Sequence, residues 1–154
     1  MGVSVRIAGD ADVAVLASLR RRWNEENAGG VIDDADFEAT FGRWWRAERD
    51  TRTFFLAQDS TAAIGMGNVK RYDRMPVAGG RSAGSWGYVG NVFVVPERRN
   101  ARIGEQLMDA ILHWAAEQRL GHLRLAPSPR ARTFYQRLGY APGAVVELDP
   151  PLRG

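Results

Sequence analysis

The sequence predicts a single α/β domain, a mixed sheet of six to seven strands flanked by helices. Segments with the two-residue period of strands alternate with segments that have the helical period. The 154 residues provide one compact core but not two of typical size. An apolar share of 45% and a charged share of 25% match ordinary globular usage. We therefore expect residues 1–154 to fold as one domain.

The N-terminal third is predicted to contain a strand and two helices. Val3 to Ala8 alternates apolar and polar residues as a half-buried strand does, and Asp10 is expected to cap the helix behind it. That helix has apolar residues at helical spacing: Val13, Leu16, Leu19 and Trp23. Asp33 and Asp34 open a second helix. Its apolar stripe is Phe37, Phe41 and Trp44. Trp45 lies beside this stripe, and we expect it to face a cleft.

Two strands and a loop follow. Residues 53–58 and 62–72 flank a short turn at Asp59 and Ser60, a pattern typical of a hairpin. Residues 73–84 are rich in glycine and arginine, which predicts a flexible loop at the edge of a site.

The centre of the molecule is predicted to be a buried strand that leads into an amphipathic helix. Tyr88 to Val95 is strongly apolar and ends at Pro96. The helix that begins near Arg102 has one apolar face, made by Ile103, Leu107, Ala110, Ile111, Trp114 and Ala115.

The C-terminal part is predicted to add two strands and a helix. His122 to Ala126 forms a short strand, and Ser128 caps the last helix, with Pro129 at its first position and Gly139 just past its end. Ala144 to Leu148 is expected to be the last strand.

Composition excludes several classes of site. The chain has no cysteine, which rules out disulfides and thiol chemistry, and with only His113 and His122 we expect no metal site. The N-terminus does not resemble a secretion signal, and no apolar run is long enough to cross a bilayer. We expect a cytoplasmic protein that does not bind membranes.

The charge balance suits an anionic ligand. The formal net charge is +3, and 20 of the 21 basic residues are arginine. Because the arginines are scattered among 18 acidic residues without a basic and aromatic repeat, we expect no nucleic-acid partner.

One segment has the pattern of an anion site. Val92 to Val95 is a strand, Arg99 lies in a short loop, and a helix begins near Arg102. A helix start directs free backbone N–H groups and a positive dipole end toward one point, which suits a phosphate or diphosphate. The same pattern also occurs in plain scaffold.

Two motifs resemble those of the GNAT superfamily, the acetyl-CoA-dependent N-acetyltransferases. In NVFVVPERRNARIGEQLMDAI, the positions that match the acyl-CoA motif are Pro96, Arg99 and Gly104. In LRLAPSPRARTFYQRLGYAP, the positions that match the second motif are Ala131, Tyr135, Leu138, Gly139 and Tyr140. Two departures are Arg102, where the family has its first glycine, and Ser128, where it often has asparagine. The resemblance implies the GNAT-like acyl-CoA N-acyltransferase fold.

The resemblance also implies a cosubstrate, acetyl-CoA, and residues that bind it. Backbone groups of the central strand are expected to bind the pantetheine arm, and the following loop and helix start the diphosphate. The implied cofactor-binding residues are Phe93, Val94, Val95, Arg99, Asn100, Ala101, Arg102, Ile103, Gly104, Glu105 and Ser128.

Catalysis is expected to use Tyr135 as general acid toward the CoA sulfur, because the matching family tyrosine often has this role. Helical spacing with Ala131 and Leu138 also fits a core tyrosine. The general base is not identified. The acceptor region of the family points to Trp23, Glu25 and Glu26 as substrate-binding residues.

The expected acceptor is the primary amine of a small molecule such as an amino acid, a polyamine or an aminoglycoside-like compound. The alternatives are a non-catalytic acyl-CoA-binding module and a protein or peptide N-acetyltransferase. Whether the chain forms a homodimer is left open.

Overall fold

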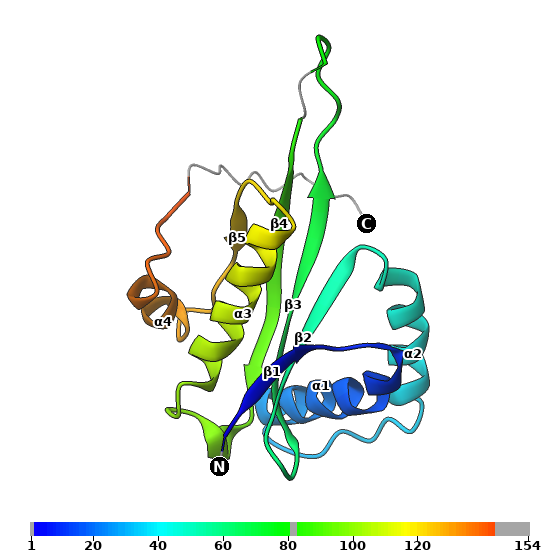
Figure 1. The fold of residues 1–154 in the computed structure, drawn as a ribbon. Coiled ribbons are helices and arrows are strands. Elements are labelled where there is room, and N and C mark those ends of the chain that lie inside the picture. Colours follow the sequence, from blue (N-terminus) through cyan, green and yellow to red (C-terminus); the bar gives the residue numbers. More distant parts are fainter. Residues whose placement is uncertain (1, 81–82, 144–154) are drawn as a thin grey trace, which may run out of the picture.

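The computed structural model describes residues 2–80 and 83–143 (Figure 1). Its elements are, in order, β1 (Ser4–Ile7), a 3-10 turn (Asp10–Asp12), α1 (Val13–Ala28), α2 (Phe37–Glu48), β2 (Arg52–Gln58), β3 (Ala63–Asp73), β4 (Ser85–Val94), a second 3-10 turn (Pro96–Arg98), α3 (Ile103–Glu117), β5 (Leu123–Leu125) and α4 (Arg132–Arg137). The predicted α/β fold is confirmed. The described residues form five strands, and the predicted strand Ala144 to Leu148 lies outside them.

The sheet is mixed because its last pair of strands is parallel. The strand order is β1-β2-β3-β4-β5, and the first three pairs are antiparallel. β5 pairs with β4 in parallel, and α3 makes the crossover between them. β3 and β4 continue as a long hairpin beyond the rest of the sheet, at the top of Figure 1.

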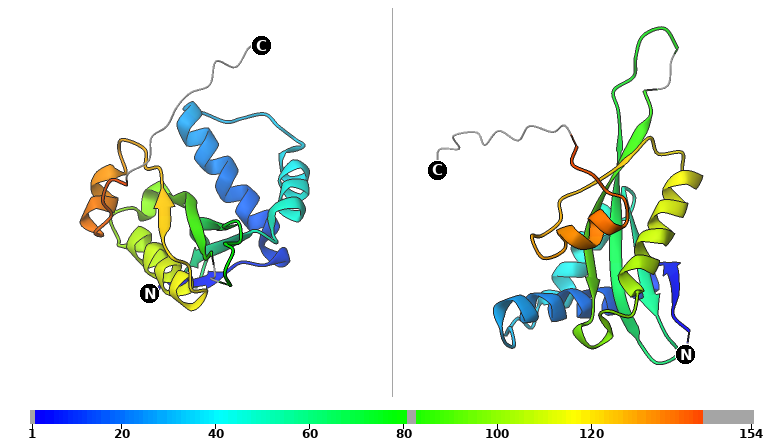
Figure 2. Two further views of the ribbon diagram at one scale, coloured as in Figure 1. Left: turned by 90° about the horizontal axis from the view of Figure 1, so that it is seen from above. Right: turned by 90° about the vertical axis from the view of Figure 1, so that its left-hand side faces the viewer.

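Helices cover both faces of the sheet (Figure 2). Phe54 and Phe55 are neighbours on β2, so their side chains point to opposite faces. The Phe54 ring contacts Trp45 of α2 at a centroid distance of 5.2 Å, whereas the Phe55 ring contacts Trp114 of α3 at 5.8 Å. α1 and α2 therefore cover one face, and α3 covers the other.

The core lies between these layers and contains the apolar face predicted for α3. Ile103, Leu107 and Ile111 of that helix are almost completely buried, as are Leu56 and Met66 of the sheet. Burial of such a side chain stabilises the fold by about 1.5–3 kcal/mol. Within the described part of the chain, no helix has the length and apolarity required to cross a membrane.

The roles of Asp10 and Trp45 differ from the sequence predictions, because the two side chains form a hydrogen bond to each other. Trp45 does not face a cleft but is only 5% exposed, and its Nε1 donates to Asp10 Oδ1 at 2.7 Å. Arg49 donates to the other Asp10 oxygen at 2.7 Å, so this carboxylate joins α2 to the turn before α1 and makes no cap hydrogen bond. The hydrogen bonds from Trp45 and Arg49 lower the pKa of Asp10.

β4 contains a bulge and then loses its neighbour β5. Met66 pairs with Phe93 and Asn68 with Gly90, so one β3 residue lies opposite two on β4. Within this bulge Asn91 has a φ of +54°. β5 pairs only with residues 87–89, so in the described part of the chain no strand covers that edge of β4 over residues 90–94. This stretch is called the open edge of β4 below.

Candidate functional site

A cavity of about 660 Å³ lies where β4 and β5 part. It is lined by Trp23 of α1, Arg52 of β2, Lys70 and Tyr72 of β3, residues 88–92 of β4, residues 125–128, and Ala131 and Tyr135 at α4. Three residues that the sequence analysis assigned to the site therefore border one space: Trp23, Ser128 and Tyr135. The cavity has the volume of a typical small-molecule site.

Tyr135 combines burial with an unpaired hydroxyl. The residue is 8% exposed and packs edge to face against Phe134 and Tyr140, at centroid distances of 5.0 and 5.8 Å. Within residues 2–80 and 83–143, no hydrogen bond is formed to its hydroxyl. Burial and, to a smaller extent, Tyr140 raise the pKa of Tyr135 to about 12. The phenol is therefore protonated at any physiological pH and can donate a hydrogen bond into the cavity.

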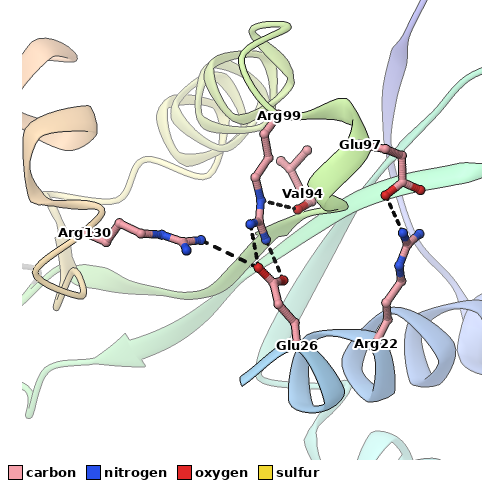
Figure 3. Close-up of polar contacts among 6 residues, drawn as sticks. All are labelled: Arg22, Glu26, Val94, Glu97, Arg99 and Arg130. Carbon is pink, nitrogen blue, oxygen red and sulfur yellow. Dashed lines mark hydrogen bonds and ion pairs between the residues drawn. The ribbon is translucent and has the colours of Figure 1, made fainter. Parts of the chain in front are cut away.

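Arg99, in the loop after β4, is held by Glu26 of α1 (Figure 3). Its two terminal nitrogens donate to Glu26 Oε1 at 2.6 Å and Oε2 at 2.7 Å, and Nε donates to the Val94 carbonyl oxygen at 3.0 Å. Arg130, before α4, approaches the same carboxylate at 4.0 Å. The hydrogen bonds from Arg99 are the largest cause of a lowered Glu26 pKa.

A second ion pair joins the same two segments. Arg22 lies one helical turn before Glu26 on α1 and pairs with Glu97 of the 3-10 turn (Figure 3). The last two turns of α1 are thus fastened to the loop that follows β4.

Glu25 and Trp23 have different surroundings. The Glu25 carboxylate accepts a hydrogen bond from the Ile32 backbone N–H at 3.1 Å, so it orders the chain after α1. The Trp23 ring lies stacked on Phe93 at a centroid distance of 5.5 Å. Of the three residues expected to bind substrate, Trp23 borders the cavity, whereas Glu25 and Glu26 have partners elsewhere.

Of the three central-strand residues predicted to bind the pantetheine arm, Phe93, Val94 and Val95, the backbone groups do not all face the open edge. The Val95 N–H donates to Ile64 O at 2.9 Å, toward β3. Because neighbouring residues of a strand direct their polar groups to opposite sides, the groups of Val94 face the open edge, where its carbonyl accepts from Arg99. The side chains of Phe93 and Val95 are 3% and 1% exposed and belong to the core.

The backbone conformation of Arg102 is one that favours glycine, the residue that the motif has at this position. Its φ of +61° and ψ of +18° lie in the left-handed region, and α3 begins only at Ile103. Asn100 is also left-handed, with a φ of +63°. Gly104 meets another constraint, since a Cβ there would lie 3.2 Å from the Phe134 ring of α4. Both motif positions thus shape the loop and the helix packing.

Ser128 stabilises the turn that precedes α4. Its hydroxyl accepts from the Ala131 N–H at 3.3 Å, and its carbonyl accepts from Ala131 and Arg132. The prediction that Ser128 caps the last helix, with Pro129 at its first position, was wrong. α4 begins four residues after Ser128, at Arg132, and its N-cap is Ala131, without a side-chain cap hydrogen bond.

The cavity is also bordered by two cations, Arg52 and Lys70, that the sequence analysis did not assign to the site. Arg52 donates to Glu48 Oε2 at 2.7 Å and to Asn68 Oδ1 at 3.0 Å, and Lys70 donates to the same Glu48 oxygen at 3.3 Å. The described residues that line the cavity include no aspartate or glutamate. The signal available in the sequence was Lys70 itself, the single lysine of the chain, in a strand that is otherwise largely apolar.

Comparisons with known proteins agree with this geometry. A family model described as "Acetyltransferase (GNAT) family" matches residues 14–140. A search of curated proteins finds no match.

Solved structures share the fold over almost the whole chain. A protein from Clostridium acetobutylicum, described as a predicted acetyltransferase with acetyl-CoA, is 19% identical, with a TM-score of 0.74 and 96% of both chains covered. Glucosamine-6-phosphate N-acetyltransferase from Arabidopsis thaliana is 15% identical, with a TM-score of 0.72 and coverage of 98% of this chain and 99% of that one. An aminoglycoside acetyltransferase from an uncultured soil metagenomic sample is 16% identical, with a TM-score of 0.74 and coverage of 99% and 100%.

The conformation of Arg102 leads to a stability prediction. The substitution Arg102→Gly should raise the free energy of unfolding by about 1 kcal/mol, because glycine adopts the left-handed region without the penalty of a Cβ. Arg102→Ala is the matched control, since it also removes the guanidinium but keeps the Cβ. Urea denaturation of the three proteins measures the difference. Equal stability of the glycine and alanine variants would contradict the backbone explanation.

Proposed function

Because the chain belongs to the GNAT family of acetyltransferases, whose cosubstrate is acetyl-CoA, we propose that it transfers the acetyl group directly to the primary amine of a small molecule. The observation that carries this proposal is the cavity of about 660 Å³, which borders both the open edge of β4 and Tyr135. A site of this volume suits a small acceptor better than a protein surface.

Two parts of the chain are expected to hold the cosubstrate. The open edge of β4 offers an extended pantetheine arm backbone groups that have no strand partner, with Val94 as the residue whose polar groups face outward. The first residues of α3, Ile103 to Glu105, have backbone N–H groups without helical partners, which suit the diphosphate. Arg99, in the loop that leads to this helix, and Arg130 converge on Glu26, so two arginines share one carboxylate there.

The transfer itself needs proximity and two proton movements. The amine nitrogen attacks the acetyl carbonyl carbon, the carbon–sulfur bond breaks, and the thiolate accepts a proton from Tyr135. The amine releases its extra proton to water in the cavity, and the phenolate regains a proton from the same source. Since the described lining has no carboxylate or histidine, this solvent path accounts for the missing general base.

The raised pKa of Tyr135 sets how it acts. A phenol with a pKa of about 12 is a weak acid, yet the desolvation that raises it also raises the pKa of a thiolate formed beside it. The hydroxyl can therefore stabilise the departing sulfur by a short hydrogen bond as charge develops, and then transfer the proton.

The test of the proposal is an amine panel. Wild-type protein with acetyl-CoA should release free thiol when a suitable small amine is added, and mass spectrometry should find the N-acetylated product. Amino acids, amino sugars, polyamines, aminoglycosides and short peptides cover the acceptor classes. Acetylation of peptides alone would contradict a small-molecule acceptor, and thiol release without N-acetyl product would contradict transfer to an amine.

Glu26 should oppose cosubstrate binding. Glu26→Gln removes a negative charge beside the expected diphosphate site and frees N–H groups of Arg99, so the Kd of acetyl-CoA should fall by roughly 3- to 10-fold at low ionic strength. Glu25→Gln is the control, because it makes the same change of net charge one residue away. Calorimetric titration measures both.

The same variant has a defined pH dependence of stability. Because Arg99 lowers the Glu26 pKa, the ion pair stabilises the fold above the unfolded value of about 4.3, and this stabilisation is lost as the pH falls through the folded pKa. The stability difference between wild type and Glu26→Gln, under about 1 kcal/mol at pH 7, should shrink as the pH falls below the unfolded value and disappear once the pH is below the folded pKa. In the binding experiment above, a higher Kd of acetyl-CoA for Glu26→Gln would contradict the first prediction and would mean that Glu26 positions Arg99 for the phosphates.

Tyr135→Phe tests the proton donor. The variant should lose roughly 10²-fold or more in kcat and keep its acetyl-CoA affinity, because the ring still fills its place and only the hydroxyl is removed. Tyr140→Phe is a matched control: its hydroxyl also has no partner among the described residues, but it is buried and does not border the cavity. More than about a third of the wild-type kcat in Tyr135→Phe, with chemistry rate-limiting, would remove Tyr135 from the mechanism.

A further inference from the structure

A row of basic side chains crosses the sheet at the end of β4 away from Arg99. Arg52 pairs with Lys70, Lys70 with Tyr88, and Tyr88 with Arg124, so these four residues occupy facing positions on β2, β3, β4 and β5. Facing residues of neighbouring strands present their side chains on the same side of a sheet. Three of the four are cations, and they lie on the face that α1 and α2 cover further along the sheet.

The positive charge of this row exceeds the negative charge that faces it. Arg52 and Lys70 share one oxygen of Glu48, and their side chains are 19% and 25% exposed. One carboxylate thus serves two cations. Both cations border the cavity, whereas Glu48 does not.

Aromatic rings surround these cations. Tyr72 and Trp86 stack at a centroid distance of 4.6 Å, and the guanidinium of Arg124 lies 5.0 Å from the Trp86 ring. His122 stacks on the other side of Trp86, and burial followed by the charges of Arg124 and Arg74 lowers its pKa. His122 is therefore held neutral rather than adding to the charge, and the local potential is positive.

This end of β4 is too far from Arg99 to serve the diphosphate of the cosubstrate. Tyr88 and Val94 are six residues apart on β4, roughly 20 Å along an extended strand. The cavity connects the basic row to Tyr135, so a ligand in it reaches both the cations and the phenol.

From this arrangement we propose that the acceptor amine also carries an anionic group, a carboxylate or a phosphate, which Lys70 and Arg52 bind at the end of the cavity opposite the open edge. The inference rests on the proposed function, whose acceptor it narrows. A polycation such as a polyamine or an aminoglycoside would meet two positive charges and no carboxylate among the described residues of the lining.

Matched pairs of amines test the anionic group. Each L-amino acid is compared with its carboxamide, and phosphoethanolamine and other phosphorylated amines with their dephosphorylated counterparts. The anionic member should have a kcat/KM at least about tenfold higher, since a charge-assisted pair is lost in the neutral one. A carboxamide also has the less basic amine, so free-base availability works against this result. The two arms distinguish a carboxylate from a phosphate.

Variants at Lys70 locate the contact. Lys70→Met should raise the KM of the anionic acceptor about tenfold or more, change the KM of the neutral counterpart less than twofold, and leave the Kd of acetyl-CoA unchanged. Lys70→Arg keeps the charge and should restore most of the affinity. Arg71→Met is the control, because Arg71 is the next residue on β3, points to the opposite face and pairs with Asp73. Glu48 keeps its bond to Arg52 in every variant, so the fold should hold.

Calorimetry with the same matched pairs, in the presence of CoA, separates the two proposals. If no amine is acetylated, yet anionic amines bind wild type and lose affinity in Lys70→Met, the proposed function fails and the anion site stands. Equal kcat/KM and equal affinity within the pairs, unchanged affinity in Lys70→Met, or no binding of any anionic amine would each overturn the inference.

Discussion

The site depends on one constraint, the incomplete pairing of β4. Over residues 87–89 this strand has neighbours on both sides, whereas beyond the bulge at Asn91 only β3 remains among the described residues. Backbone groups that lack a strand partner must find another polar partner, because leaving a buried one unpaired costs about 1–3 kcal/mol. At Val94 the Arg99 side chain supplies it. The parting of β4 from β5 also opens the cavity, into which α4 places Tyr135. One irregularity in one strand therefore accounts for both the open edge that is proposed to bind acetyl-CoA and the cavity that is proposed to hold the acceptor.

Acidic and basic side chains are balanced differently near the two ends of β4. At the end near α3, Glu26 and Glu97 of two segments neutralise Arg99 and Arg22. At the other end, a single carboxylate, Glu48, faces Arg52 and Lys70. The first arrangement fastens α1 to the loop after β4 with exposed or half-exposed ion pairs, which contribute little to stability and can exchange partners. The second leaves positive charge at the cavity on side chains that are only 19% and 25% exposed, where partial desolvation makes it act more strongly on a bound anion. These two arrangements are the basis for proposing that two anionic ligands bind at opposite ends of one strand.

Local patterns were enough to predict the elements near the candidate site. The apolar stripe of Ile103, Leu107 and Ile111, the Pro96 stop and the motif around Tyr135 were found in the positions expected. The predictions for Asp10 and Trp45 were wrong because an N-cap and a cleft residue were inferred from neighbours in sequence. Their actual bond joins residues 35 positions apart. The left-handed conformation of Arg102 was not predicted either. The sequence shows that an arginine replaces the glycine of the motif, but it does not show the φ angle that makes glycine favourable there.

By itself, the sequence determined the mixed α/β fold, because the fold depends on periodicity. Motifs of fixed spacing also gave the strand, loop and helix expected to hold acetyl-CoA, and Tyr135 as the expected proton donor. Only the tertiary structure decided which charged residues come together at the candidate site. Glu26 and Arg99 are 73 positions apart, and Arg52, Lys70 and Arg124 come from three different strands. Their contacts arise from strand register and from the packing of α1 against the loop after β4, which long-range burial of apolar surface sets and no local pattern records.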